Sequence, residues 1–348
     1  MIFVAGEPLH TNNPPRQGRE ILDVLLENPA LVSASRSFRD TPEKVFGVEE
    51  SSVGGGVGRR NHVYLFQREF ATVDPRLIDF IGTDEATTCV GLVIRNRENG
   101  MTSVAHMDSP NVVEGGLSQM LADLVDTTIE AEFDVHLIGG YEDTPAKQTG
   151  TSSKYAKHAK VEGHSLPLCV KLVEVLGSSC LKFHIQTLFV LRHNTRRDSE
   201  GKRRPIFDGF LVETSAGSVV PARFDTTTRC PDEIVRRIRV SSSFEDPRWT
   251  GKLLDTYNWR RNQFVIASCL WTRRLVHIVS GLRKLPDSDL LSVCSTSPDA
   301  EGPDFIFNHR RMWDYLIQHP NWKETFPMGR PRLFERNDVG EWTMVEAD

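Results

Sequence analysis

Apolar residues along this chain follow a helical period in some segments and a strand-like pattern in others. Leu117, Met120, Leu121, Leu124 and Val125 recur at helical spacing and predict an amphipathic helix over residues 115–130. Similar patterns predict helices over residues 21–26, ending at Asn28-Pro29, over 168–176, from 231 onward and over 303–319.

Runs of β-branched and aromatic residues predict strands between these helices. They cover the first residues and 62–67, 88–95, 101–107, 133–140, 181–191, 206–213, 217–224 and 263–271, with a terminal hairpin over 332–346. Helices and strands mix without strict alternation, and hairpins join neighbouring strands. The pattern predicts an α+β fold with helices outside stacked sheets.

Two polar segments are predicted to be surface loops, one near residues 47–60 and one near 143–163. The first is rich in glycine but lacks the Lys-Ser/Thr ending of a phosphate-binding P-loop. No break in composition divides the chain. We therefore predict a single domain over residues 1–348, with these two segments as loop insertions.

Composition narrows the classes of function. The 348 residues are 39% hydrophobic and 26% charged, as in a soluble globular protein. A formal net charge of -5 gives no electrostatic reason to expect a nucleic acid partner. The basic runs at 202–204 and 236–239 are predicted to be solvated faces. No window approaches the ~18 apolar residues of a membrane span, so no membrane contact is expected.

The six cysteines are scattered without the spacing of a disulfide framework, which favours a reducing compartment. The apolar start over residues 1–5 is too short for the core of a signal peptide. Cytoplasm or nucleus is therefore the expected location. No Cys-x-x-Cys and no ligand-spaced set of histidines and carboxylates occurs, so neither a metal nor a cofactor is expected.

The most specific chemical signal is Cys89 at the start of one predicted strand and His106 near the end of the next. A thiol paired with an imidazole can attack an amide. A hairpin loop over residues 96–99 would place the two side chains directly opposite each other. A tighter turn at Asn99-Gly100, which is the stronger turn signal, would place His106 opposite Val93, about 13 Å along the strand from Cys89.

Neighbouring polar residues fit a site. Thr83 can orient the imidazole, and the carboxylates Asp84, Glu85 and Asp108 can pair with an ammonium group of a substrate. Each feature also has an ordinary interpretation, because strand cysteines are usually buried hydrophobes and Asp84-Glu85 can form a turn. The combination, rather than any one member, favours a functional site.

The segment Gly-Thr-Asp-Glu-Ala-Thr-Thr-Cys at 82–89 resembles a motif of the eukaryotic protein N-terminal asparagine amidohydrolases. The resemblance continues through Gln67-Arg68-Glu69, His106-x-Asp108, residues 135–140, residues 295–301 and His319-Pro320. It spans most of the chain, and the segments 47–60 and 150–170 resemble insertions of a plant member.

This resemblance implies hydrolysis of the side-chain amide of N-terminal asparagine to aspartate, which creates a signal for arginyl transfer and ubiquitin-dependent degradation. It also implies a layered α-β-β-α sandwich similar to that of bacterial chemoreceptor glutamine deamidases. Those enzymes use a cysteine, a histidine 17 residues later and a threonine six residues earlier, places that Cys89, His106 and Thr83 occupy here. This spacing favours the longer hairpin loop.

The resemblance further implies a thioester on Cys89 and an acidic group that reads the substrate's α-ammonium, with Asp84, Glu85, Asp108 and Glu301 as candidates. Ser295 and Ser297 are candidates for the pocket lining, although they also fit an ordinary turn before Pro298. Two alternatives remain open: a deamidase of internal glutamine, and an inactive interaction module of the degradation pathway.

Overall fold

Two large sheets organise the computed structural model, which describes residues 1–9, 18–47, 61–125, 131–143, 163–338 and 340–346. Nearly all of the two predicted loop insertions lies outside these residues. The eight-stranded sheet has the order β15 (Leu254–Asp255), β5 (Glu69–Val73), β8 (Thr102–Met107), β7 (Val90–Asn96), β9 (Glu132–Tyr141), β10 (Lys182–Leu191), β1 (Ile2–Val4) and β2 (Glu7–Pro8). The five-stranded sheet has the order β3 (Lys44–Phe46), β14 (Ser218–Phe224), β13 (Phe210–Glu213), β6 (Phe80–Thr83) and β4 (His62–Leu65).

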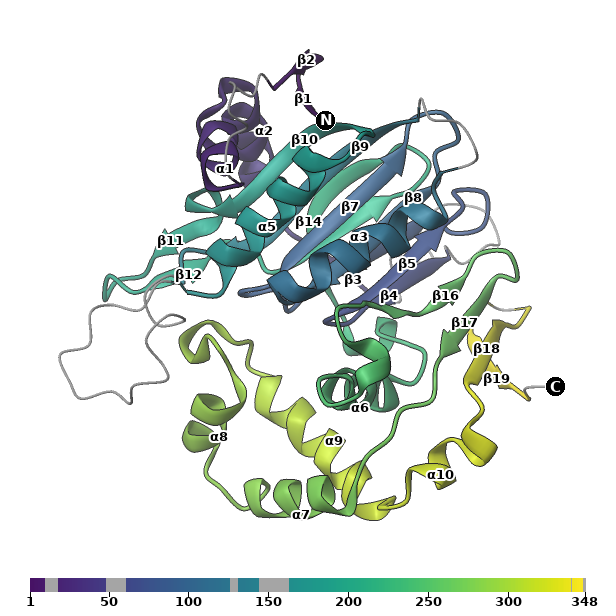
Figure 1. Cartoon of the computed structure of the whole chain (residues 1–348). Coiled ribbons are helices and arrows are strands. Elements are labelled where there is room, and N and C mark those ends of the chain that lie inside the picture. Colours follow the sequence, from purple (N-terminus) through teal and green to yellow (C-terminus); the bar gives the residue numbers. More distant parts are fainter. Residues whose placement is uncertain (10–17, 48–60, 126–130, 144–162, 339, 347–348) are drawn as a thin grey trace.

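Smaller sheets and helices complete the described chain (Figure 1). The smaller sheets are β16 (Tyr257–Asn258), β17 (Gln263–Ile266), β18 (Arg332–Arg336) and β19 (Trp342–Val345), and the pair β11 (Thr195–Arg197) and β12 (Arg203–Pro205). The helices are α1 (Gly18–Glu27), α2 (Pro29–Asp40), α3 (Val113–Ala122), α5 (Ser165–Ser178), α6 (Glu233–Ser243), α7 (Arg273–Leu282), α8 (Asp287–Cys294), α9 (Phe305–Gln318) and α10 (Trp322–Thr325). None of the described helices is long and apolar enough to span a bilayer.

Strands β7 and β8 are buried on both faces because their side chains alternate between two cores. Leu92 of β7 packs in one core with Leu117 of α3 and with residues of α5, and Figure 1 shows both helices lying across the eight-stranded sheet. Val93 packs in the other core with Val212 of the five-stranded sheet. Helices and mixed sheets together confirm the predicted α+β class.

Several predicted boundaries are wrong. Asn28-Pro29 does not simply end the first helix, because Asn28 caps a second one, α2: its side chain accepts hydrogen bonds from the N–H groups of Ala30 and Leu31, and proline is favoured at a first helical position. The predicted strand over 263–271 ends at Ile266. The predicted strand over 206–213 begins only at Phe210.

The register of the β7–β8 hairpin differs from both predicted alternatives. Gly91 pairs with His106 and Arg95 pairs with Thr102, so the pairing lies two residues away from each prediction. Cys89 is therefore diagonal to His106 instead of directly opposite. Because a shift of two residues keeps a side chain on the same face, both residues still point toward the five-stranded sheet.

Local hydrogen bonds at the hairpin loop explain this register. The Asn96 side chain accepts a hydrogen bond of 2.8 Å from the N–H of Glu98, a local turn typical of asparagine. The Asn96 N–H donates to the Met101 carbonyl at 2.9 Å, and Gly100 has a positive φ of 74°. Asn96 and Met101 therefore flank a loop of four residues, 97–100, which lies one residue later than the predicted loop over 96–99.

Candidate active site

A cavity of about 210 Å³ lies where Cys89 immediately precedes β7. Residues that are distant in sequence meet in its wall, from the 84–89 segment, from β8, from α6 and from the 294–312 region. The predicted site residues that line it are Cys89, His106, Glu85, Asp108, Ser295 and Glu301. The remaining three, Thr83, Asp84 and Ser297, lie behind or beside this wall.

Thr83 holds the imidazole of His106 from behind. Its hydroxyl oxygen lies 2.7 Å from His106 Nδ1 and 2.8 Å from the carbonyl oxygen of Leu65. A carbonyl can only accept, so the hydroxyl donates to Leu65 and accepts from Nδ1–H. This assigns the proton of a neutral His106 to Nδ1 and leaves the lone pair on Nε2.

The Nε2 atom of His106 is buried and has no hydrogen-bond partner among the described residues. A buried polar atom without a partner is costly, and it indicates a group that awaits a proton or a ligand. Cys89 lines the same cavity and lies diagonal to His106 on the same face of the hairpin. The arrangement places a base beside a thiol.

Burial keeps both groups neutral in the free protein. Desolvation, together with the nearby carboxylates of Asp108 and Glu301, raises the pKa of the Cys89 thiol well above its usual value. Desolvation lowers the pKa of His106 to about 4, although Glu85 and Glu69 act in the opposite direction. The pair therefore rests as a neutral thiol and a neutral imidazole. A neutral imidazole is competent to take the proton at the moment of attack.

Asp84 is fully engaged away from the Cys89 cavity. Its carboxylate accepts hydrogen bonds from the Tyr64 hydroxyl at 2.6 Å and from the Phe224 N–H at 2.8 Å, and it pairs with Arg229 at 3.0 Å. Desolvation and the charge of Glu85 raise its pKa to about 6. This carboxylate joins the start of the 84–89 segment, called here the catalytic segment, to the five-stranded sheet.

Glu85 lines the cavity, but its carboxylate forms ion pairs with two arginines. Arg237 of α6 contacts both of its carboxylate oxygens at 3.0 Å, and Arg229 approaches one of them at 2.6 Å. Burial alone would raise its pKa, but Arg237 and Arg229 outweigh it and lower the pKa. Glu85 also has a positive φ of 61°, so its ion pairs hold a strained backbone turn four residues before Cys89.

Asp108 follows β8 and lies on the same side as His106. One of its carboxylate oxygens accepts from the Ser109 hydroxyl at 3.2 Å. The other, Oδ2, is buried and has no hydrogen-bond partner among the described residues. Burial raises the pKa of Asp108, and Arg68, together with hydrogen bonds from Ser109 and Gln67, opposes this only in part. Asp108 therefore brings to the cavity wall a buried carboxylate that has few hydrogen-bond donors.

Glu301 reaches the cavity from a loop that packs on the catalytic segment. It accepts hydrogen bonds from the hydroxyls of Ser295 and, at 3.5 Å, Ser297. Ser297 also donates to the Thr87 hydroxyl at 2.9 Å, two residues before Cys89. Burial raises the pKa of Glu301 to about 7. The predicted turn at 295–298 is thus part of the site, with Ser297 serving as a link to Thr87.

The basic run at 236–239 is not a solvated face. Arg236 and Arg239 are fully buried and both pair with Glu69 of β5, at 2.5 and 2.6 Å. Arg237 lies on the cavity side. The sequence carried a signal for this: positions 235 and 238 on the same helix are apolar and buried, so the arginines flank the buried stripe.

Other residues of the cavity wall were not predicted from the sequence: Phe66, His164, Arg237, Val240, Ser241, Cys294, Phe305, Asn308, His309 and Met312 contribute to it. Most lie on α6 and α9, elements with no chemical motif of their own. Within the described residues, no group of three or more histidines, cysteines or carboxylates is arranged to hold a metal ion.

Comparison with known proteins shows which family the chain belongs to. The family model described as protein N-terminal asparagine amidohydrolase matches residues 54–344. The chain belongs to this family. It is therefore an enzyme, an amidohydrolase. A protein N-terminal asparagine amidohydrolase of Arabidopsis thaliana is 54% identical over 94% of this chain and 93% of its own length.

Animal members of the family are more distant. The proteins of that name from Sus scrofa and Homo sapiens are 26% identical over 84% of this chain and 86% of their own lengths. The family resemblance predicted from residues 82–89 is thus confirmed. The higher identity to the Arabidopsis protein agrees with the expected plant type.

Proposed function

We propose that this chain hydrolyses the side-chain amide of an N-terminal asparagine and releases ammonia to leave N-terminal aspartate. The observation that carries the proposal is the unpartnered Nε2 of His106, fixed by Thr83, in the same cavity as the Cys89 thiol. The names of the relatives supply the substrate.

The reaction proceeds through a thioester. His106 Nε2 takes the thiol proton as Cys89 Sγ attacks the amide carbon, and backbone N–H groups near Cys89 stabilise the oxyanion. The imidazolium returns the proton to the leaving nitrogen, so ammonia departs and a thioester remains. His106 then takes a proton from water, whose oxygen attacks the thioester; the thiol leaves and the product is a carboxylic acid.

Asp108 and Glu301 are the proposed readers of the substrate's α-ammonium. In asparagine the α-nitrogen is only three bonds from the amide carbon, so its partner must lie close to the Cys89 sulfur. Asp108 and Glu301 are the two carboxylates that raise the pKa of that thiol. Asp84 and Glu85 are already paired with arginines. We therefore rank Asp108 first and Glu301 second, and assign Asp84 and Glu85 to positioning the segment.

The pH profile of kcat/KM is expected to report Glu301. Its raised pKa of about 7 means that the carboxylate becomes charged as the pH rises through 7, and only the charged form attracts an ammonium. Above about pH 8 the substrate's α-amine loses its own proton, so the profile should fall again. In Glu301→Gln the rising limb should disappear, with kcat/KM lower by about tenfold near pH 7.5. An unchanged rising limb in this variant would assign it to another group.

Thr83→Val is expected to lower kcat by about 100-fold with little change in KM. Valine cannot accept the hydrogen bond from His106 Nδ1–H, so the imidazole loses both its orientation and its fixed tautomer. Thr83→Ser, which keeps the hydroxyl, is the matched control and should retain most of the activity. Steady-state kinetics on both variants, with melting temperatures to verify folding, make the measurement. Equal activity in the valine and serine variants would remove Thr83 from the mechanism.

The layered α-β-β-α sandwich implied by the resemblance is part of the proposal. The core shared by β7, α3 and α5 and the core between the two large sheets supply three of its layers. A third core carries residues of the five-stranded sheet together with Val240 of α6, which supports α6 as part of the outer helical layer.

The product is the proposed entry to further processing: N-terminal aspartate would be arginylated and the protein then degraded through ubiquitin, in the cytoplasm or nucleus. Neither nucleic acid nor membrane has a place in this proposal.

A peptide panel tests the function. Peptides beginning with asparagine, beginning with glutamine, beginning with N-acetylated asparagine, or carrying only internal asparagine and glutamine are incubated with the protein, and ammonia and peptide mass are measured. We expect conversion of the free N-terminal asparagine alone. Equal conversion of the acetylated peptide would contradict recognition of the α-ammonium, and conversion of internal glutamine would favour the alternative deamidase. Absence of any conversion would favour the inactive interaction module.

A further inference from the structure

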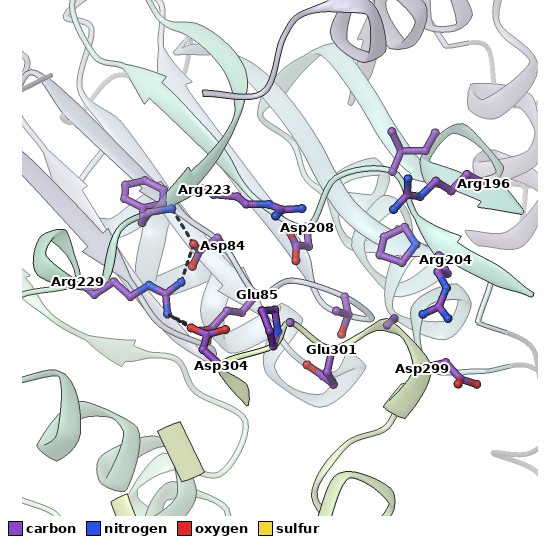
Figure 2. A pocket seen from close by; sticks show the side chains of 17 residues that line it. Asp84, Glu85, Arg196, Arg204, Asp208, Arg223, Arg229, Asp299, Glu301 and Asp304 are labelled. Atoms are coloured by element: carbon purple, nitrogen blue, oxygen red, sulfur yellow. Dashed lines mark hydrogen bonds and ion pairs between the residues drawn. The ribbon is translucent and has the colours of Figure 1, made fainter. Parts of the chain in front are cut away.

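A second cavity of about 310 Å³ adjoins the Cys89 cavity (Figure 2). The two share Glu85, Thr87 and Glu301 in their walls. The second cavity extends from this shared wall to the residues around Arg196 and Arg204 on the β11–β12 hairpin. Nothing in the proposed mechanism uses it.

The substrate chain must leave the Cys89 cavity in some direction. The Cα atom of the second residue lies 3.8 Å from that of the asparagine, so the second side chain falls within reach of any space that shares a wall with the asparagine site. The second cavity shares such a wall, next to Glu301, the proposed ammonium partner. It is thus placed to receive the second residue.

The charges around this cavity favour a cation. The ten charged side chains labelled in Figure 2 are six carboxylates and four arginines. Three of the arginines already have carboxylate partners: Arg229 with Asp84 at 3.0 Å, Arg204 with Asp198 at 2.8 Å and Arg223 with Glu43 at 3.1 Å. The fourth, Arg196, is exposed to solvent at the far end, where screening weakens it.

Asp208 is a buried carboxylate of this cavity whose charge is only partly compensated. Its Oδ1 atom is buried and has no hydrogen-bond partner among the described residues. The cation that acts on it most strongly, Arg223, is shared with Glu43. Desolvation therefore raises the pKa of Asp208. The carboxyl group of Glu301, on the shared wall, is in the same condition because its partners are neutral hydroxyls.

Asp208 is also rigidly connected to the catalytic segment. Its main-chain carbonyl accepts a hydrogen bond of 2.8 Å from the N–H of Ala86, three residues before Cys89, and it lies just before β13. Its backbone is thus tied to the segment that ends at Cys89. Figure 2 shows Asp208 between the end of the cavity formed by Arg196 and Arg204 and the end formed by Asp84 and Arg229.

We propose that this second cavity binds the side chain of the second substrate residue, and that Asp208 makes it favour lysine or arginine over glutamate or aspartate there. The inference rests on the proposed function, since it names a preference of the same reaction. A cationic side chain would supply the hydrogen-bond donor that Asp208 Oδ1 lacks. It would also supply a positive charge beside the buried carboxyl groups of Asp208 and Glu301.

Four peptides that differ only at the second position test this: Asn-Lys, Asn-Met, Asn-Gln and Asn-Glu, followed by one common sequence. For the wild type we expect kcat/KM for Asn-Lys about tenfold above that for Asn-Glu, with the neutral peptides between them. In Asp208→Asn the ratio of Asn-Lys to Asn-Glu should fall severalfold toward unity. Asp23→Asn, at an exposed position on α1, removes the same charge far from the site and should leave the ratio unchanged.

The outcomes separate the inference from the function on which it rests. Turnover of Asn-Met with equal rates for Asn-Lys and Asn-Glu would overturn the preference and leave the proposed function intact. A preference that persists in Asp208→Asn would assign it to another group. Affinities of the same peptides for Cys89→Ala, measured by calorimetry, give a readout without turnover: tighter binding of Asn-Lys is expected, and equal binding would contradict the inference.

Discussion

Cys89→Ala is expected to lower kcat/KM for an N-terminal asparagine peptide by at least about 10⁴-fold while the protein remains folded. The variant keeps the base, the ammonium partners and the cavity, but it has no atom that can form the thioester. Because Cys89 contributes only a small side chain at the edge of the core, the melting temperature should change little. Ammonia release and circular dichroism make the measurement.

Cys294 offers a matched control for this variant. It lines the same cavity and carries a free thiol, but it lies at the end of α8, away from the β7–β8 face that holds His106. Cys294→Ala should therefore keep most of the activity. Comparable losses in the two variants would show that the cavity, rather than one nucleophile, was damaged, and full activity of Cys89→Ala would remove the cysteine mechanism.

Glu69→Gln is expected to destabilise the fold by about 3–5 kcal/mol, because it leaves two fully buried arginines without a counter-charge. Arg236 and Arg239 have no exposed side-chain surface, and both pair with Glu69. A loss of this size is a large part of the about 5–15 kcal/mol that holds a typical domain folded. Urea unfolding of the variant makes the measurement.

An exposed ion pair gives the control for Glu69. Glu114 pairs with Lys171 at 2.9 Å, and its side chain is 71% exposed, so Glu114→Gln should cost less than about 1 kcal/mol. A Glu69 variant as stable as the Glu114 variant would contradict the structural role of the buried pair.

The buried ion pairs of Glu69 should make the stability of the wild type sensitive to acid. Burial alone would raise the pKa of Glu69, but Arg236 and Arg239 hold it below its usual 4.5. Its contribution is therefore fully present above pH 4.5 and is lost as the pH falls through the lowered value.

The sequence predicted the reactive residues more accurately than it predicted the backbone register that positions them. The spacing of Thr83, Cys89 and His106 could be read directly, and the structure brings His106 against Thr83 and into the Cys89 cavity. The hairpin register could not be predicted, because it depends on the hydrogen bond that the Asn96 side chain accepts from the N–H of Glu98. The periodicity of apolar residues does not record such a bond. A two-residue slip preserves the face, so the site was recoverable even though the register was wrong.

The roles of the carboxylates depended on partners that are distant in sequence. Asp84 and Glu85 lie five and four residues before Cys89 in the chain, yet Arg229 and Arg237, more than 140 residues later, engage them. Glu301 lies more than 200 residues after Cys89 in the chain, yet it is part of the same cavity wall. Which charges meet is decided by tertiary packing, which a local pattern cannot show. By contrast, α7 has Leu275, Val279 and Leu282 at helical spacing, so it was predictable and was missed.

The central claim is that Cys89 forms a thioester with the asparagine side chain. An acid quench within the first turnover, followed by mass spectrometry of the digested protein, tests it most directly. We expect the peptide that contains Cys89 to carry the mass of the substrate less one ammonia, and hydroxylamine to remove it. A quenched enzyme that turns over substrate but carries no such adduct, or carries it on a cysteine other than Cys89, would contradict the account.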